Sequence, residues 1–217
     1  MSEIVEQHRR YLPHYQEKCR YYFLTWRLDG ELPVHIRRNI CEMQEVMNKI
    51  KQTESGVKNL SLVQEYSELV EKYDEQLGRY LPTGIDLSEE KNGKIVADAF
   101  KYYDNKLYKL CAYCIMPNHV HLLIQPGSEE DVVQAKISNI IQKLKSFTAK
   151  EINKVNNRTG ALWRADYFDR QIRNDRDYCY TVEYILNNPV KAGLVDEQRG
   201  WAFSFYRSLE DVLGESE

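Results

Sequence analysis

Hydrophobic and polar positions along the chain follow two spacings, one typical of strands and one typical of helices. Residues 21–28 are rich in aromatic and branched side chains and stop at Asp29-Gly30, which is typical of a strand closed by a turn. Asn174 is expected to cap the last helix, and Pro189 is expected to end it. The predicted strands are 21–28, 107–115 and 119–125, with one or two short strands within 163–172, and the predicted helices are 33–49, 88–103, 130–153 and 174–188.

The order of these elements predicts an α+β fold. Strand, helix, strand, strand, helix, strand is the order of the split βαβ unit, so we expect a ferredoxin-like antiparallel sheet with helices in a single domain over residues 1–217. Residues 52–80 are polar and helix-prone, and we interpret them as a helical insertion in the first crossover that serves packing or a partner surface. Residues 196–217 form a C-terminal tail after the last helix.

His119 and His121 lie in a predicted strand and are the most informative pair of residues in the chain. Side chains alternate between the two faces of a strand, so both imidazoles point to one side and Val120 points to the other. Two neutral imidazoles can chelate one divalent ion, but a site that does chemistry needs a third ligand and an open position. The plain alternative is a pair of histidines on a half-exposed strand.

Basic residues are concentrated in one part of a chain whose net charge is −3. The window 136–173 holds nine lysines and arginines against three acidic residues. Lys136, Lys143 and Lys150 recur every seven residues and form a stripe on one helix face, which is typical of contacts with a phosphate-rich partner. A solvated helix face is the alternative. Arg164 and Arg170 are further candidate phosphate contacts, or they pair with Asp166 or Asp169.

The sequence shows no feature of a membrane or secreted protein. No stretch approaches 18 apolar residues, and the first ten residues are charged and lack the apolar core of a signal peptide. The five cysteines are scattered and odd in number, which is typical of reduced thiols. We therefore expect a cytoplasmic protein with no membrane partner.

Tyr184 and Asn188 lie four residues apart on the last predicted helix and so share one face. The amide oxygen of Asn188 suits a hard divalent ion, and the phenol of Tyr184 becomes a nucleophile when a base or a positive field favours its phenolate. Tyr180 lies one turn earlier on the same face and is the rival nucleophile.

Two motifs together resemble the single-tyrosine HUH transposases, and most closely the REP-associated tyrosine transposases. They are MPNHVHLL at 116–123 and YILNNPVKAGLV at 184–195, with the basic helix between them. Shorter matches lie at 12–15, 163–170 and 201–206, so the similarity covers most of the chain outside 52–80.

The resemblance implies a metal-dependent endonuclease and strand transferase that acts on single-stranded or hairpin DNA in transposition and recombination. In that family the two histidines bind Mg²⁺ or Mn²⁺, a polar residue four after the tyrosine completes the site, and the tyrosine forms a 5′-phosphotyrosine. By position these roles fall on His119, His121, Asn188 and Tyr184, whereas Tyr180 does not match the family tyrosine. Many relatives carry glutamine where this chain has the shorter Asn188. Relatives act as monomers or homodimers, so the resemblance leaves a monomer and a homodimer open.

Two other functions compete with this interpretation. A histidine-triad nucleotide hydrolase would need a third histidine at the position of Leu123. A domesticated relative would bind a DNA or RNA hairpin without cleaving it. Incubation with hairpin DNA and Mn²⁺, followed by a search for a covalent adduct, would separate cleavage from binding.

Overall fold

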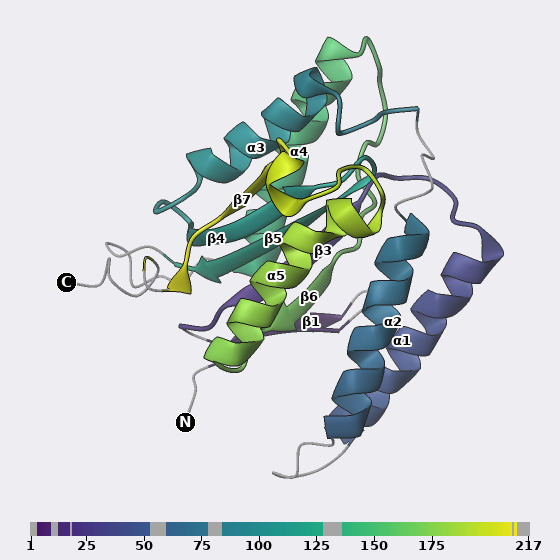
Figure 1. Cartoon of the computed structure of the whole chain (residues 1–217), viewed down its shortest axis with the longest axis vertical. Coiled ribbons are helices and arrows are strands. Elements are labelled where there is room, and N and C mark those ends of the chain that lie inside the picture. Colours follow the sequence, from purple (N-terminus) through teal and green to yellow (C-terminus); the bar gives the residue numbers. More distant parts are fainter. Residues whose placement is uncertain are drawn as a thin grey trace.

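A five-stranded antiparallel sheet forms the centre of the molecule, with strand order β6-β3-β5-β4-β7 (Figure 1). This computed structural model describes residues 4–9, 13–17, 19–52, 60–77, 84–127, 136–209 and 211. The strands of the sheet are β3 (Tyr22–Arg27), β4 (Tyr108–Ile115), β5 (His119–Pro126), β6 (Phe168–Gln171) and β7 (Ser204–Tyr206).

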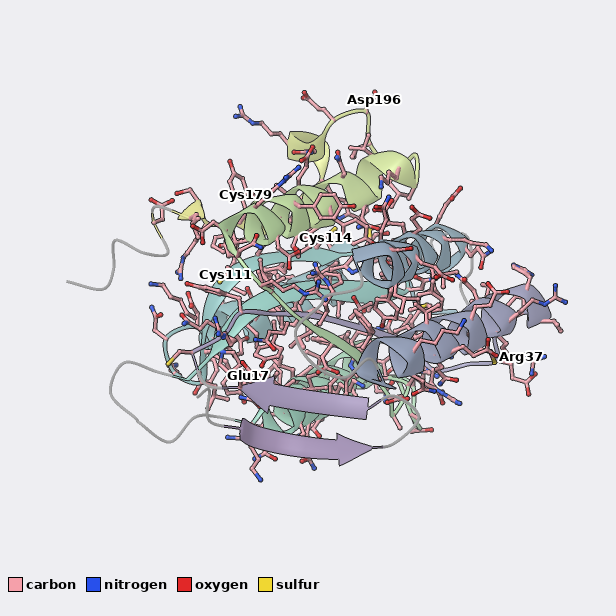
Figure 2. All side chains as sticks on the ribbon, turned by 90° about the horizontal axis from the view of Figure 1, so that it is seen from below. Glu17, Arg37, Cys111, Cys114, Cys179 and Asp196 are labelled. Carbon is pink, nitrogen blue, oxygen red and sulfur yellow. The ribbon has the colours of Figure 1, made fainter. Side chains whose placement is uncertain are left out.

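The first four strands in this order confirm the predicted ferredoxin-like sheet. Strand β3 lies between β6 and β5, and β4 pairs with β5 through a hairpin closed by a hydrogen bond from Met116 N to His119 O of 2.9 Å. Three strands were not predicted. Strand β7 extends the sheet beyond β4 within the segment expected to be a tail, and β1 (Ile4–Arg9) and β2 (Pro13–Glu17) pair with each other in a separate sheet (Figure 2).

Helices cover both faces of the sheet. The helices are α1 (Val34–Gln52), α2 (Leu60–Leu77), α3 (Glu90–Tyr102), α4 (Ile137–Val155) and α5 (Asp175–Lys191), followed by a 3₁₀ turn (Gln198–Gly200). Helices α3 and α4 cover one face of the sheet and share a hydrophobic core with it (Figure 1). Helix α5 covers the other face and shares a second core with it and with residues of α1 and α2. Within the described residues, no helix combines the length and the apolar character needed to cross a membrane.

Alternation along β5 separates the two cores. Val120, Leu122 and Ile124 are fully buried in the core beneath α3 and α4. Full burial of such a side chain contributes roughly 1.5–3 kcal/mol, so this face fixes the register of the strand. His119 and His121 consequently point to the opposite face, toward α5, as the alternation predicts.

Helix α5 does not end at Pro189 but continues to Lys191, so that prediction was wrong. A proline removes its own N–H and crowds the preceding turn, but its carbonyl is intact, and the carbonyls of Asn188 and Pro189 still accept bonds from Ala192 N and Leu194 N, each 2.9 Å long. Helix α4 begins at Ile137, and the first part of the range 130–153 falls outside the described residues.

The helical segment predicted over 52–80 contains α2, which packs beside α1 (Figure 1). Both helices come between β3 and α3 in the chain, and α3 takes the place of the first crossover helix in the ferredoxin-like order. Helices α1 and α2 therefore stand outside the βαββαβ unit and cover part of the face that carries the histidines.

Candidate active site

His119 and His121 lie beside each other on the face of β5 that α5 covers. Both side chains are completely buried, their ring centroids are 4.8 Å apart, and their Nε2 atoms face each other at 3.1 Å. The residues belong to a central strand, so their backbones are fixed by β3 on one side and by β4 on the other.

A chain of hydrogen bonds sets the orientation of His119. The carbonyl of Leu77, at the end of α2, can only accept, so the amide nitrogen of Asn118 donates to it. The amide oxygen of Asn118 therefore faces His119 Nδ1 at 2.6 Å, and this nitrogen carries the hydrogen. His119 Nε2 is left with a lone pair that points toward His121.

His121 has a partner that allows either tautomer. Its Nδ1 lies 3.0 Å from the hydroxyl of Thr25, which can donate or accept. The Phe23 ring stacks on the imidazole with centroids 5.5 Å apart, so the ring is held in an apolar slot. When Nδ1 donates to Thr25, both Nε2 atoms present lone pairs to one point, which is the arrangement that a metal ion requires.

Tyr184 and Asn188 reach the same place from α5. The side chain of Asn174 accepts a bond from Asp177 N at 2.9 Å and caps the helix, as predicted. The Tyr184 ring lies edge-on to His121, with centroids 5.8 Å apart, and only 8% of the residue is exposed. The amide of Asn188 donates to the Tyr184 carbonyl at 2.9 Å and also hydrogen-bonds the side chains of His121 and Tyr184. The fold thus brings all four predicted residues together.

Asp74, on α2, is a fifth member of the site that sequence reasoning missed. Its Oδ2 atom accepts a hydrogen bond from the Tyr184 hydroxyl and lies 3.8 Å from His121 Nε2. One donor atom from each of Asp74, His119 and His121 lies within 4.8 Å of the others. The signal was available in the sequence, because Asp74 shares the buried face of an amphipathic helix with Val70 and Leu77, where a carboxylate is unusual without a partner.

Burial sets the charge state of these groups. It lowers the pKa of His119 to about 3, and burial together with the neighbouring imidazole lowers the pKa of His121 well below its ordinary value. Burial raises the pKa of Asp74 to about 7, against a smaller opposing effect of the Tyr184 hydrogen bond. Burial and the nearby Asp74 raise the pKa of Tyr184 well above its ordinary value. Both imidazoles are therefore neutral at neutral pH, and the phenol is protonated.

The donor set fits a divalent metal ion. Two imidazole nitrogens with lone pairs and one carboxylate oxygen converge in a buried, largely apolar setting. The second carboxylate oxygen, Asp74 Oδ1, is buried and accepts no hydrogen bond from any residue that the structure describes. A buried carboxylate oxygen without a donor is costly, and a cation would compensate it.

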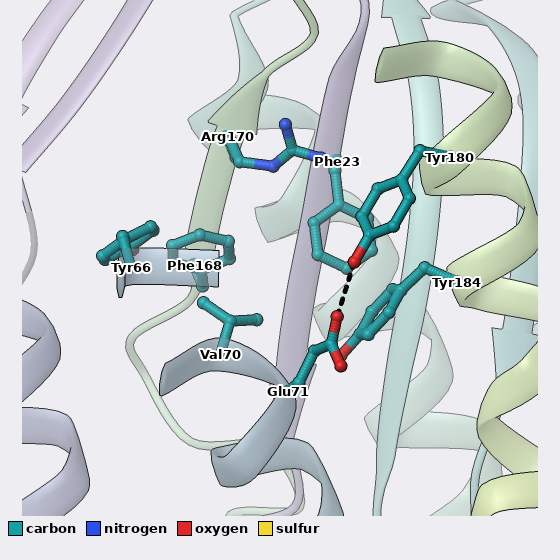
Figure 3. Close-up of a pocket in the computed structure, with 8 residues that line it drawn as sticks. All are labelled: Phe23, Tyr66, Val70, Glu71, Phe168, Arg170, Tyr180 and Tyr184. Carbon is teal, nitrogen blue, oxygen red and sulfur yellow. Dashed lines mark hydrogen bonds between the residues drawn. The ribbon is translucent and has the colours of Figure 1, made fainter. Parts of the chain in front are cut away.

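Helix α2 packs against α5 beside this cluster, and its residue Glu71 meets Tyr180 of α5 (Figure 3). Tyr180 donates from its hydroxyl to Glu71 at 2.6 Å, and Lys191 donates to the same carboxylate at 3.1 Å. Beside these contacts is a small cavity of about 30 Å³, lined by Phe23, Tyr66, Val70, Glu71, Phe168, Arg170, Tyr180 and Tyr184. Tyr180, the rival nucleophile, is half exposed and its hydroxyl is directed to Glu71, whereas the Tyr184 hydroxyl is directed to Asp74.

The predicted DNA contacts are distributed around the molecule. Arg170 does not pair with Asp166 or Asp169, because it binds Asp177 at 2.7 and 2.9 Å and donates to Thr181 at 2.7 Å. Arg164 is half exposed and lies 3.4 Å from Asp29. Lys136, Lys143 and Lys150 are exposed. Lys136 directly precedes α4, and the other two lie on α4, which covers the face of the sheet opposite the histidines.

Part of this chain is similar to a known family of proteins. Residues 87–188, which hold both histidines, Tyr184 and Asn188, match the family model described as transposase IS200 like. A protein of Haemophilus influenzae whose assigned name is REP-associated tyrosine transposase is 29% identical over 109 residues, which are 48% of this chain and 62% of that protein. The REP-associated tyrosine transposase of Escherichia coli K12 is 28% identical over 104 residues, which are 47% of this chain and 57% of that protein.

The chain thus spans about six tenths of the length of these curated relatives. A solved structure described as the REP-associated tyrosine transposase bound to a REP hairpin aligns with 92% of this chain and 81% of its own, at 17% identity and a TM-score of 0.44. Asp74 lies outside the residues that the family model matches.

Proposed function

We propose that this protein is a metal-dependent enzyme that cleaves and rejoins single-stranded DNA at hairpins during transposition, and the match of residues 87–188 to the IS200-like transposase family supports this proposal. The observation that carries the proposal is the position of the Tyr184 hydroxyl. It lies in the same buried cluster as the two facing imidazole nitrogens of His119 and His121. A nucleophile and a candidate metal site occur together, which is the combination that metal-assisted covalent phosphoryl transfer uses.

In this proposal Tyr184 attacks a DNA phosphodiester. The phenol oxygen forms a bond to phosphorus, the bond from phosphorus to the 3′ oxygen breaks, and the departing oxygen takes up a proton as a 3′ hydroxyl. The proton of the phenol is held by Asp74, which already accepts it in a hydrogen bond. The energy of the broken bond is kept in the 5′-phosphotyrosine, so rejoining needs no ATP.

A divalent ion bound by His119, His121 and Asp74 would neutralise the charge that develops on the attacked phosphate. Imidazole ligands disfavour Mg²⁺ relative to softer ions, and a carboxylate suits Mn²⁺, so the mixed set is better suited to Mn²⁺ than to Mg²⁺. Asn188 stays the alternative third ligand. Titration of Mn²⁺ into the Asp74→Ala and Asn188→Ala proteins would show which residue is the third ligand, because only the variant that loses a ligand should bind the metal more weakly.

DNA can reach these groups only when α2 moves. Both histidines are fully buried and Tyr184 nearly so, and α2 lies over them through Asp74 and Glu71. Helix α2 is joined to α5 by the hydrogen bonds of Asp74 and Glu71 and by the hydrophobic core that Tyr66 and Val70 share with Tyr184, so binding of the DNA strand must supply the free energy that separates them. The closed site also keeps the phenol protonated and water away until a substrate arrives.

The test is formation of a covalent adduct. Wild-type protein incubated with a single-stranded hairpin oligonucleotide and Mn²⁺ should give a complex that survives a denaturing gel. Tyr184→Phe removes one oxygen and should abolish the adduct while retaining hairpin binding, and Tyr180→Phe is the matched control that should retain it. Hairpin binding by the wild type with no adduct would favour the alternative, a hairpin-binding protein without cleavage. An adduct formed by Tyr184→Phe but not by Tyr180→Phe would move the nucleophile one turn upstream.

A further inference from the structure

A second cavity, of about 530 Å³, lies next to the candidate active site. It is enclosed by β3, the first half of α1 and the segment 164–168, and it is much larger than the cavity beneath Glu71. Its volume is within the roughly 300–1,000 Å³ typical of small-molecule sites. The residues that α1 contributes include Arg37, Cys41 and Gln44, which follow helical spacing and so form one face of that helix.

The cavity shares two of its walls with the metal cluster. Thr25 lines it and contacts His121 Nδ1 at 3.0 Å. Tyr73 also lines it and directly precedes Asp74 on α2. A molecule in the cavity would therefore lie beside the metal cluster, with the side chain of Thr25 between the molecule and His121.

The charge of the cavity wall favours an anion. Arg27 is partly buried there, and one of its terminal nitrogens donates to the carbonyls of Leu28 and Gly30 at 3.0 and 3.2 Å. Within the described part of the chain, no carboxylate forms an ion pair with this guanidinium, which hydrogen-bonds Tyr73 instead. A partly buried guanidinium without an ion-pair partner retains donors for a phosphate. Arg37 and Arg164 add two positive charges to the wall and Glu31 and Asp166 add two negative ones, so the lining keeps a net charge of +1, and Arg164 also lies 3.4 Å from Asp29.

Aromatic residues form another part of the wall. Tyr167 and Phe168 also line the cavity, and both are largely buried, so their positions are fixed. A positively charged groove with aromatic rings is the usual means of binding single-stranded nucleic acid, in which the backbone follows the charges and bases stack on the rings.

We propose that this cavity binds one unpaired nucleotide of the DNA strand that Tyr184 cleaves, directly next to the scissile phosphate. Its phosphate lies against Arg27 and Arg37, and its base lies against Tyr167 and Phe168. The proposal rests on the proposed function for the identity of the strand. It adds a specificity site formed by β3 and α1, which lie outside the residues matched by the family model.

The chain carries its own probe for this site. Cys41 is exposed and lines the cavity, whereas Cys19 and Cys179 are exposed and do not line it (Figure 2 shows Cys179 on α5 and Arg37 on α1). The experiment uses the Tyr184→Phe protein, so that binding is measured without cleavage. The protein is alkylated with iodoacetamide in the presence of one of three ligands, and the modified cysteines are measured by mass spectrometry. The ligands are a hairpin that carries an unpaired oligothymidine flank, the same hairpin lacking the flank, and thymidine monophosphate.

The flanked hairpin should slow alkylation of Cys41 and leave Cys19 and Cys179 unchanged, and neither the blunt hairpin nor the mononucleotide should do so. Equal alkylation of Cys41 with and without the flank, at DNA concentrations where anisotropy shows the hairpin bound, overturns the proposal. Equal protection by the mononucleotide at the same concentration as the flanked hairpin also overturns it, because the cavity would then bind free nucleotides as well as a strand. Protection of Cys41 in this variant, together with no adduct in the wild type, would retain the cavity and reject the chemistry.

Substitution gives a second, independent measurement. Arg37→Gln should weaken binding of the flanked hairpin by a factor of several, roughly three to tenfold for one charge-assisted contact at an exposed position. It should also lower the slope of log affinity against log salt by about 0.7. Arg38→Gln is the matched control, because Arg38 is exposed on the same helix and does not line the cavity. Equal effects of the two substitutions contradict the proposal.

Discussion

Asp74→Asn should stabilise the metal-free protein at neutral and alkaline pH, although it removes a residue from the candidate active site. Asparagine has nearly the same shape, and its amide oxygen still accepts the hydrogen bond from Tyr184. What the substitution removes is a carboxylate that burial has made costly to ionise.

The expected size follows from the pKa of Asp74. Burial raises it from 3.8 to about 7, so folding favours the protonated acid. A group whose pKa is raised on folding contributes full stability below its unfolded pKa, and that contribution falls as the pH rises toward the folded value. The difference of about 3 between the two pKa values corresponds to roughly 4 kcal/mol, of which about 3 kcal/mol is lost between about pH 5 and pH 8.

Urea denaturation in EDTA at these two pH values would measure the effect. His119 and His121 act in the opposite direction below about pH 6.5, where their lowered pKa values cost stability, but they are present in both proteins and cancel in the difference. The variant should gain about 3 kcal/mol relative to wild type from the lower to the higher pH. Saturating Mn²⁺ should reverse the order, because only the wild type has the full set of ligands. Parallel stability curves for the two proteins in EDTA would refute the argument.

Three further outcomes are expected. Asn118→Ala removes the hydrogen bond that orients His119 and should weaken Mn²⁺ binding about 10- to 100-fold by calorimetry; unchanged affinity would mean that the ring is held by packing alone. Lys143→Gln should lower the salt slope of hairpin binding by about 0.7, and a wild-type slope would remove α4 from the DNA interface. Thr148→Val should cost about 1–3 kcal/mol of unfolding free energy, because the buried Trp163 Nε1–H now donates to Thr148 at 2.8 Å, and metal affinity should not change.

The strands of the sheet and the two pairs of predicted site residues followed from local patterns. Alternation in β5 was sufficient to put His119 and His121 on one face, and the spacing of four residues was sufficient to put Tyr184 above Asn188. These relations depend only on strand and helix geometry within single elements. The meeting of β5 and α5 depends on the fold, and the resemblance to a known family supplied it.

Asp74 could not be found in this way because its contacts are long-range. It is separated from Tyr184 by 110 positions and belongs to a helix outside the matched family region. Its burial beside apolar residues on the same helix face was visible in the sequence, but its partner was not. Short edge strands such as β7, with three residues, were missed because their hydrogen bonds come from the neighbouring strand and leave little pattern of their own.

The two positively charged regions lie on opposite faces of the sheet, and the segment before β6 connects them. The lysine stripe follows α4, and the cavity lies beside α1 on the histidine face. Lys145 of α4 donates to the carbonyls of Arg164 and Asp166 at 2.8 and 2.9 Å, and both of these residues line the cavity. Strand β6 is an edge strand, so a substrate can pass around it without crossing a core. A hairpin that touched both regions would therefore have its stem along α4 and its unpaired flank turned around residues 164–166 into the cavity. In that arrangement Arg164 contacts the DNA backbone where the flank turns. Arg164→Gln should therefore weaken the binding of flanked hairpins more than that of blunt ones, whereas Lys143→Gln should weaken the binding of both equally.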